Sequence, residues 1–231
     1  MGYLEERPTI PRNPTHKYVA VIGDMVNSRE VPAARRPAVQ KHFQELMTAL
    51  NREYRGALAA RFAITLGDEF QGLLQTSVVL PDLIWKLEED FSDRQLRVGL
   101  GLGTLDTPLQ TYAINIDGPA LHNAREAIEI AAKNDILGGV FRGFGHLDEV
   151  LSGMARILYF HRSRWTLAQR KIINLLRNGM SQSEAADHLR VSRQVVSKQV
   201  ASTGWSAYRS AENAWRIILR DYVDPMIGHK Q

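Results

Sequence analysis

The sequence predicts an α+β sandwich followed by an all-α helix-turn-helix domain. Three observations predict this fold class: strand and helix signals alternate over the first 146 residues, two short helical segments flank a turn near residue 190, and positive charge gathers in the C-terminal part. The 231 residues exceed the roughly 100–200 that are typical of one domain. We expect four parts along the chain: a flexible, polar and proline-rich arm over 1–16, the α+β domain over 17–146, a connecting helix over 147–164, and the helix-turn-helix domain with a C-terminal helix over 165–231.

The α+β domain is expected to begin with a buried strand and a helix. Residues 17–23 (KYVAVIG) form a short apolar, β-rich run that ends at Asp24. A helix follows, because apolar residues recur at helical spacing: Val39, Phe43, Leu46, Leu50 and Tyr54. Two further apolar runs, 61–66 and 70–74, flank Gly67-Asp68-Glu69, which is the pattern of a hairpin.

The second half of this domain continues the alternation. Residues 78–91 favour a helix with one apolar face. Residues 96–102 favour a strand, and one of its faces is left nearly bare by alternating glycines: Gly99, Gly101 and Gly103. A helix is expected from Gly118-Pro119 through Ala132, and a last strand over 136–144. The resulting β-α-β-β-α-β-α-β order is typical of an α+β sandwich with a mostly antiparallel sheet and helices on one side.

Residues 181–199 (SQSEAADHLRVSRQVVSKQ) have the pattern of two short helices around a tight turn. The small Ala185 and Ala186 allow the helices to approach closely. Ser192 is a good N-cap for the second helix, because its hydroxyl can accept a hydrogen bond from an otherwise unpaired backbone N–H. Arg190 stands where many such motifs carry glycine, which predicts a looser turn. The residues expected to fill the space between the helices are Leu189, Val191, Val195, Val196 and Val200.

One face of the second helix is polar. At positions i, i+1, i+4 and i+5 it carries side chains that suit base edges and phosphates in a DNA major groove. With the capping residue they form the predicted DNA-binding set: Ser192, Arg193, Gln194, Ser197 and Lys198. Residues 153–231 hold 13 Lys and Arg against 5 Asp and Glu, whereas residues 1–152 hold 16 against 20. This asymmetry indicates that the C-terminal part faces a polyanion, and the alternative is an ordinary helical hairpin with a solvated face.

Composition excludes several classes of site. The chain has no cysteine, so disulfides, thiolate catalysis and cysteine-ligated metals are excluded. The seven histidines are scattered without an i, i+4 pair, which argues against a histidine metal site. No apolar run approaches the roughly 18 residues that span a bilayer, and the polar N-terminus lacks the apolar core of a signal peptide. We therefore expect a cytoplasmic protein without a membrane partner.

Three carboxylates lie at expected strand ends. Asp24 follows the first strand, and Asp68 and Glu69 occupy the hairpin tip. In a sheet where these strands are neighbours, the carboxylates converge into a metal site that suits Mg²⁺, which usually shares its ligands with substrate phosphates. The alternative is that Asp24 and Asp68 are turn residues whose side chains bond to local backbone.

The loop after Asp24 (MVNSRE) adds groups that suit an anionic phosphate. It offers backbone N–H groups, a hydroxyl and a guanidinium. The predicted nucleotide-binding residues are Met25, Asn27, Ser28 and Arg29.

Several motifs of the first domain resemble known families. The string GDEFQGLL (67–74), the strand-terminal Asp24 and the order of elements look like the palm domain of class III nucleotide cyclases and GGDEF diguanylate cyclases, a ferredoxin-like sandwich. Over residues 17–220 the chain more closely resembles the SatD family, in which a palm-like domain carrying VIGDMVNSRE, GDEF and DGPALHNAREAI is joined to a helix-turn-helix. The resemblance implies a cyclase-like palm domain over 17–146.

The cyclase resemblance also implies roles for single residues. Asp24 and Asp68 match the two metal-binding aspartates, with the Met25 carbonyl nearby. Glu69 matches an acidic residue of the GGDEF hairpin. Arg125 matches a phosphate-binding or transition-state arginine and is the candidate catalytic residue.

Two departures from the cyclase pattern favour nucleotide binding over turnover. Leu121 stands where class III cyclases carry an Asn four residues before the arginine, and Ile64 stands where they use a Lys to recognise the base. An arginine without its partner can still bind phosphate, but efficient cyclisation needs several preorganised groups. The alternative for Arg125 is a surface or salt-bridged helix residue.

A final helix is expected from Gly204-Trp205 to Asp224-Pro225. Apolar and aromatic residues recur along it at spacings of three and four, and they form either helix core or a dimer seam: Tyr208, Ala211, Trp215, Ile218 and Tyr222. The palm cyclases also assemble as pairs, so a homodimer is expected.

Three functions agree with these features. The favoured one is a DNA-binding regulator whose palm-like domain binds a nucleotide or phosphorylated ligand with Mg²⁺. An active nucleotidyl cyclase or nucleotidyltransferase with a regulatory DNA-binding module is the alternative. A degenerate palm domain that serves only as a dimerisation scaffold is the third.

Overall fold

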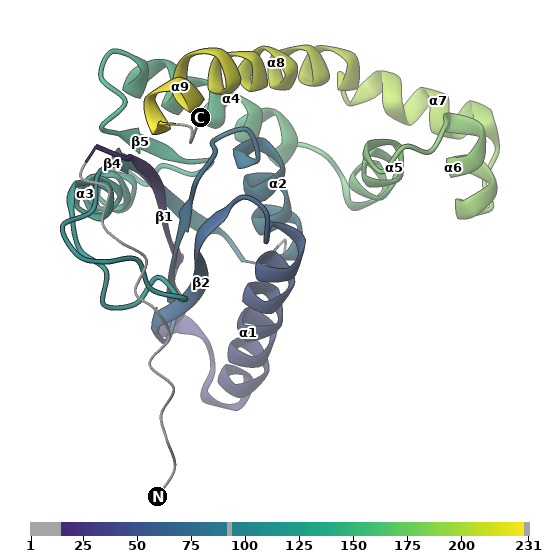
Figure 1. Cartoon of the computed structure of the whole chain (residues 1–231). Coiled ribbons are helices and arrows are strands. Elements are labelled where there is room, and N and C mark those ends of the chain that lie inside the picture. The colour runs from purple at the N-terminus through teal and green to yellow at the C-terminus, as the bar shows by residue number, and fades with distance from the viewer. Residues whose placement is uncertain (1–14, 92–93, 229–231) are drawn as a thin grey trace, which may run out of the picture.

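A computed structural model describes residues 15–91 and 94–228, so the expected arm over 1–16 lies almost entirely outside the described residues. The described chain forms one five-stranded sheet flanked by helices, and a smaller helical unit protrudes to one side (Figure 1). The α+β class predicted for the first part of the chain is confirmed.

The strands of the sheet are β1 (Tyr18–Met25), β2 (Leu58–Leu66), β3 (Glu69–Leu74), β4 (Leu96–Gly103) and β5 (Val140–Arg142). Their order is β2-β3-β1-β4-β5, and all neighbours are antiparallel except β4 and β5, which are parallel. The first four strands and the helices α1 (Arg36–Glu53) and α2 (Leu80–Asp90) form a β-α-β-β-α-β unit of the ferredoxin-like kind. β5 extends this unit into a mixed sheet.

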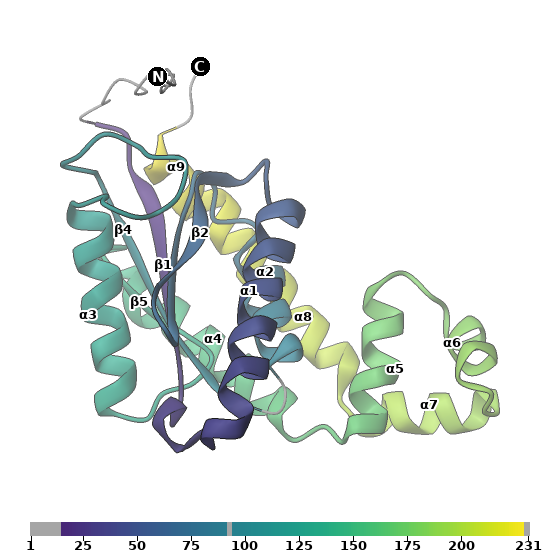
Figure 2. The same cartoon turned by 90° about the horizontal axis from the view of Figure 1, so that it is seen from below.

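Helices cover both faces of the sheet, which corrects the prediction that they lie on one side. α1 and α2 pack on one face, and α3 (Pro119–Lys133) packs on the other (Figure 2). The side chains of β1 show why. Val19 and Val21 belong to the core that α1 and α2 complete, whereas Ala20 and Ile22 belong to the cluster that α3 completes. A strand with apolar residues on both faces is stable only between two layers.

α3 lies unusually close to β4, because glycines leave the strand face under it bare. A Cβ atom at Gly101 would lie 2.2 Å from the carbonyl oxygen of Ala120 and from the backbone nitrogen of Ala124. At Gly99 and Gly103 the nearest backbone atoms of α3 would lie 2.5 Å away. α3 therefore packs directly on the bare strand face that these glycines predicted.

The C-terminal part is helical and consists of α4 (Leu147–Ser163), α5 (Leu167–Arg177), α6 (Gln182–Leu189), α7 (Arg193–Ser202), α8 (Trp205–Ile218), a π-helical turn (Leu219–Val223) and α9 (Asp224–Ile227). α4 runs without interruption through Gly153. α5, α6 and α7 form the protruding helical unit around a small core of its own: Ile172, Ala185, Ala186 and Val196. In the part of the chain that the structure describes, no helix is both long and apolar enough to cross a membrane.

The end of the chain returns to the sheet domain. The final helix was expected to stop near Asp224-Pro225, but α8 ends at Ile218 and α9 begins at Asp224. Pro225 fits the first turn of α9, where its missing N–H would have no helical partner. The Asp224 carboxylate accepts hydrogen bonds from the backbone nitrogen and the hydroxyl of Ser77, at 2.6 and 2.7 Å. α9 is therefore anchored to the loop after β3.

The aromatic stripe of α8 is helix core within one chain. Tyr208 and Trp215 are buried. The Trp215 ring lies 6.1 Å from the ring of Phe141, and the Tyr208 ring lies 5.8 Å from that of Trp85. Tyr222 departs from the stripe, since 61% of it is exposed. The buried part of the stripe is thus covered by the chain itself and cannot also serve as a seam between two copies.

α2 is the element of the sheet domain that holds the helical unit. Two guanidinium groups lie over the Trp85 ring, those of Arg162 at 4.6 Å and Arg177 at 4.3 Å from its centre. Its indole nitrogen donates a hydrogen bond to Asn174 Oδ1 at 3.1 Å. Glu88 forms a buried ion pair with Arg162, and burial lowers the pKa of Arg162 to about 10. These contacts hold α4 against α2 through Arg162, and α5 against α2 through Asn174 and Arg177.

Candidate functional site

A row of charged side chains crosses three neighbouring strands at one end of the sheet. Asp24 of β1 pairs in register with Glu69 of β3 on one side and with Arg97 of β4 on the other. Directly opposed residues of antiparallel strands point to the same face of a sheet. This is the face that α3 covers, since Ile22, two residues before Asp24, belongs to the α3 cluster. Arg125 of α3 therefore joins the row.

Glu69 and Arg125 are each other's partners. Nη1 and Nη2 of the Arg125 guanidinium donate to the two Glu69 carboxylate oxygens, with Nη2 at 2.8 Å from Oε1. The Thr65 hydroxyl also donates to Glu69 Oε1, at 2.9 Å. The bond from Arg125, more than any other contact, holds the pKa of Glu69 below its usual range. Glu69, a predicted metal ligand, and Arg125, the candidate catalytic residue, thus form an ion pair with each other. This arrangement matches the alternative interpretation of Arg125 as a salt-bridged helix residue.

The residues that the structure describes satisfy the Asp24 carboxylate only in part. Arg97 Nη1 lies 3.8 Å from Asp24 Oδ2, while Oδ1 is buried and has no hydrogen-bond partner among the described residues. Burial raises the pKa of Asp24, the Arg97 charge opposes this rise, and the charges of Asp68 and Glu69 add to it. A buried carboxylate oxygen without a donor is costly unless a cation or a ligand N–H or O–H group reaches it.

The hairpin turn holds Asp68 against the loop after β1. The Ser28 hydroxyl donates to Asp68 Oδ2, and the backbone nitrogen of Met25 donates to the Asp68 carbonyl at 3.1 Å. Ser28 begins a short 3₁₀ turn (Ser28–Glu30), and Asn27 before it takes a left-handed conformation with φ of 54°. The predicted loop residues and Asp68 are therefore neighbours, although they lie 40 residues apart. The side chain of Arg29 lies outside the described residues.

A cavity of about 310 Å³ opens beside this loop. Two residues that the sequence analysis did not select, Arg36 and Gln40 from the first turns of α1, line it with Asp68. Arg36 Nε donates to the Val31 carbonyl at 3.1 Å. Their sequence signal was weak, because the helical pattern identifies only the apolar face of α1. The cavity is lined by Met25, Ser28, Val31, Arg36, Val39, Gln40, Gly67 and Asp68.

The acidic residues suit a shared metal ion better than a metal site built by the protein alone. Within the described ranges, no three or more Asp, Glu or His side chains are arranged to hold a metal ion. Mg²⁺ is often bound through one or two carboxylates, and water and substrate phosphates complete its shell. The unsatisfied oxygen of Asp24 fits such a role, with Asp68 as the second carboxylate.

The exposed face of α7 is a second candidate surface. The Ser192 hydroxyl accepts a hydrogen bond from the Val195 backbone nitrogen at 3.3 Å, which confirms the predicted N-cap. Val196 is fully buried, so its side of α7 faces the core of the helical unit. Val195 points in another direction around the helix and is 45% exposed. The prediction that Val195 and Val191 fill the space between the helices was therefore wrong. All five predicted DNA-binding residues are exposed: Ser192, Arg193, Gln194, Ser197 and Lys198.

The turn between α6 and α7 is tight although it lacks glycine. Arg190 ends α6 in a left-handed conformation, with φ of 55° and ψ of 45°. Its backbone N–H bonds back to the Asp187 carbonyl at 3.2 Å. The looser turn predicted from this residue was wrong, because Arg190 adopts the conformation that glycine usually supplies, at a cost of about 1–2 kcal/mol.

Comparison with solved structures finds cyclases and a regulator. A bacterial light-regulated adenylyl cyclase is 11% identical, with a TM-score of 0.40 over 55% of this chain and 75% of that chain. The guanylyl cyclase domain of the RhoGC fusion protein from the aquatic fungus Blastocladiella emersonii is 17% identical, with a TM-score of 0.33 over 50% and 74%. A regulator of polyketide synthase expression from Bifidobacterium adolescentis is 17% identical, with a TM-score of 0.28 over 93% and 82%.

Comparison with protein families gives a match to most of the chain. A search of the curated proteins finds no match. The sequence model of the SatD family matches residues 18–218, which include the whole sheet domain, the protruding helical unit and α8. The chain therefore belongs to the SatD family.

Proposed function

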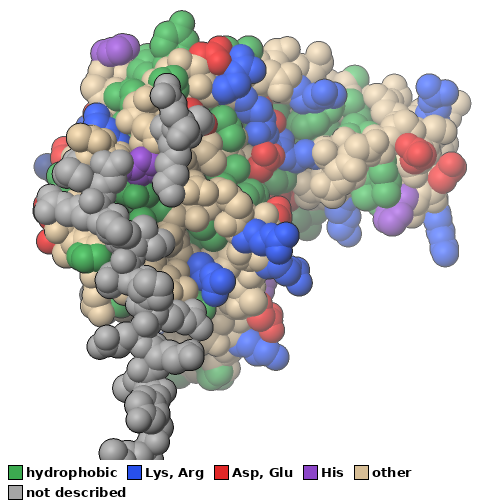
Figure 3. Space-filling model, in the orientation of Figure 1, with side chains coloured by type: hydrophobic (Ala, Val, Ile, Leu, Met, Phe, Trp, Pro, Cys, Tyr) green, Lys and Arg blue, Asp and Glu red, His purple; other side chains and the backbone are tan. Residues whose placement is uncertain are grey.

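We propose that this protein is a DNA-binding regulator whose palm-like sheet domain binds a nucleotide, or a similar phosphorylated ligand, together with Mg²⁺. The observation that supports it most is the exposed polar face of α7, which lies on the helical unit that stands out from the sheet domain. Figure 3 shows Lys and Arg side chains projecting from this unit into the solvent. The unit belongs to the part of the chain with the excess of positive charge.

The local structure of α7 suits entry into a major groove. Recognition helices of helix-turn-helix proteins contact base edges with residues of their N-terminal half. Here Arg193 and Gln194 follow the capped N-terminus directly, and Ser197 lies one turn further along the same face. Val196 anchors the opposite face of α7 in the core of the helical unit. The helix is thereby held at its back and free on its polar side.

The cavity beside the β1 loop is the proposed ligand site. Asp68, which lines the cavity, and Asp24, which lies at the neighbouring end of β1, would hold Mg²⁺. The Ser28 hydroxyl would keep Asp68 in position, and Arg36 would donate to the phosphate groups. When bound, Mg²⁺ neutralises part of the phosphate charge. Binding is favoured over cyclisation, because Arg125 is already paired with Glu69, whereas cyclisation needs donors that are free to meet the charge that develops.

Regulation requires that the ligand bind two arrangements of the helical unit with different affinity. The α2 interface is the connection through which such a preference would act, since α2 contacts α5 through Trp85 and Asn174. A homodimer would present two α7 helices to DNA half-sites about 34 Å apart, one turn of the duplex.

Replacing both Arg193 and Lys198 with alanine is expected to weaken DNA binding at least tenfold. Each contact to a base edge is worth about 1–3 kcal/mol, and each phosphate contact that is lost lowers the slope of log affinity against log salt by about one. Fluorescence anisotropy with a labelled duplex pool of random sequence, at four salt concentrations, measures both quantities.

The matched control for this experiment is Arg156→Ala, which removes an exposed arginine from α4, outside α7. Its affinity for DNA should stay within twofold of that of the unmodified protein. If the double variant loses no more affinity and no more salt slope than this control, α7 is not the DNA-binding helix.

Asp24→Asn is expected to abolish Mg²⁺-dependent nucleotide binding and, at the same time, to stabilise the metal-free protein. The pKa of Asp24 is raised in the folded state, so the folded protein favours the protonated acid. The ionised carboxylate therefore lowers the free energy of unfolding at neutral pH. Asparagine is neutral at every pH. The gain in stability should therefore be present at neutral pH and should shrink as the pH falls through the pKa of Asp24. Calorimetry with ATP and GTP, and thermal unfolding at several pH values, provide the two readouts.

Asp187→Asn is the control, because it removes an exposed acid from α6 of the helical unit. It should leave nucleotide binding unchanged. If Asp24→Asn and the unmodified protein bind nucleotide with equal affinity, the proposed ligand site is wrong. Mass spectrometry of the same incubations tests the alternative: a cyclic or linked nucleotide made only when Asp24 is present would show an enzyme.

A further inference from the structure

We propose that a second cavity, between α1 and the end of α2, binds the phosphoryl group of a small molecule. The cavity has a volume of about 560 Å³, and Val39 lines both this cavity and the cavity of the proposed nucleotide site. The two cavities lie on different sides of the start of α1, because consecutive residues of a helix point about 100° apart. Arg35 at the start of α1 lines this cavity, whereas the next residue, Arg36, lines the cavity of about 310 Å³.

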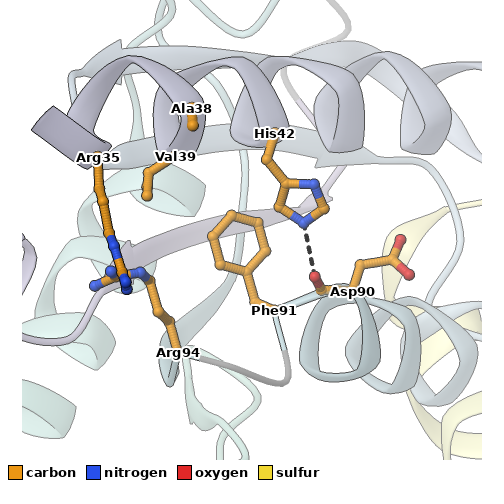
Figure 4. Close-up of a pocket in the computed structure, with 7 residues that line it drawn as sticks. All are labelled: Arg35, Ala38, Val39, His42, Asp90, Phe91 and Arg94. Carbon is orange, nitrogen blue, oxygen red and sulfur yellow. Dashed lines mark hydrogen bonds between the residues drawn. The ribbon is translucent and has the colours of Figure 1, made fainter.

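Two arginines from distant parts of the chain converge here. Arg35 ends the 3₁₀ turn (Ala33–Arg35) before α1, and Arg94 follows α2. Figure 4 shows the two guanidinium groups directed to the same side of the cavity. Neither side chain forms an ion pair or a hydrogen bond with a residue that the structure describes. Arg94 is half-buried, and its Nε has no acceptor.

The other titratable residues that are described in the lining of this cavity, Asp90 and His42, are engaged elsewhere. The Asp90 carboxylate is directed away from the arginines in Figure 4 and lies 3.5 Å from Lys86 Nζ. His42 Nε2 lies 2.7 Å from the backbone carbonyl of Asp90, so it donates its proton there. The two guanidinium groups therefore face the cavity without a counter-charge from these neighbours.

This arrangement favours an oxyanion ligand. Like charges that share a site repel each other, and the repulsion is stronger where one of them is partly desolvated. An anion placed between them turns this repulsion into attraction. Planar guanidinium groups bind phosphate oxygens two at a time, which lysines cannot do. The apolar side chains of Val39 and Phe91 line the same cavity, which is large enough for an organic group attached to the phosphate.

The test is NMR of the arginine Nε–Hε groups in the full chain, in the absence of Mg²⁺ and in an Asp24→Asn background. This background separates the result from the proposed nucleotide site. Inorganic phosphate and AMP are titrated in parallel. We expect a saturable shift of the Arg94 signal, which is assigned by its loss in Arg94→Gln. Equal affinity for both probes shows that the phosphoryl group alone is recognised, and tighter binding of AMP shows that the apolar wall contributes.

Charge-matched variants decide whether this is a site. The double variant Arg35→Gln/Arg94→Gln should bind phosphate at least about tenfold more weakly, as expected for the loss of charge-assisted hydrogen bonds. Binding to this variant is followed by thermal stabilisation, since the Arg94 signal is absent. Arg52→Gln/Arg55→Gln removes two exposed arginines at the other end of α1 and should bind within twofold of the background protein. Arg35→Gln alone, at an exposed position, keeps the test valid if Arg94→Gln impairs folding. No saturable shift, or an equal loss in both double variants, would overturn the proposal.

Discussion

Gly101→Ala is expected to destabilise the protein by about 3 kcal/mol, the upper end of the range for overpacking substitutions. The added methyl group would meet the backbone of α3, 2.2 Å from both the Ala120 oxygen and the Ala124 nitrogen. A side chain could rotate away, but a helix backbone can yield only by moving the whole helix. Moving α3 would also disturb the cluster around Ile22, because that cluster depends on the same helix. Urea unfolding followed by circular dichroism measures the loss.

The matched control is Gly153→Ala, in the middle of α4. A Cβ atom there would have nothing within 4 Å, and alanine stabilises an exposed helix position by roughly 0.5–1 kcal/mol relative to glycine. The same chemical change should therefore have opposite signs at the two positions. Equal effects of the two substitutions on the free energy of unfolding would contradict the close packing of α3 on β4.

Trp85→Ala is expected to cost about 3–5 kcal/mol and to loosen the helical unit from the sheet domain. The indole is only 6% exposed and is surrounded by the rings of Trp165, Trp205 and Tyr208. Its removal leaves a cavity and takes the π surface away from Arg162, whose charge is buried. Hydrogen exchange read by mass spectrometry should show faster exchange in α5, because α5 loses its contacts with the indole and keeps only polar contacts with α2, such as those of Arg170 with Glu89 and of Arg177 with Asp82.

Trp85→Phe separates packing from hydrogen bonding at this position. Phenylalanine keeps an aromatic ring next to the guanidinium groups but cannot donate to Asn174. It should cost about 1 kcal/mol for that bond and somewhat more for the smaller ring. If Trp85→Ala leaves the exchange rates of α5 unchanged, Trp85 does not hold the helical unit, and the ion pairs of Glu89 and Asp82 would be the remaining contacts of α2 with α5. In that case the ligand site and α7 would need another connection.

The sequence predicted the features whose signals are local. The alternation of strand and helix, the hairpin at Gly67-Asp68 and the N-cap at Ser192 were all found where the pattern placed them. These features depend on neighbours a few residues away, such as the Val195 N–H that Ser192 accepts. The glycines of β4 also had a clear signal, since their alternation marks one face of a strand. That signal did not say what would cover the face.

The sequence by itself thus determined the α+β class of the first domain, the family and the residues that could take part in a site, because periodicity, capping and motif strings are properties of short segments. Only the tertiary structure decided which of those residues meet. It placed α3 opposite α1 and α2, joined Glu69 to Arg125 across 56 residues, and returned α9 to the loop at Ser77. The physical reason is that strand register and the burial of both sheet faces fix distances between segments, and no single segment carries that information.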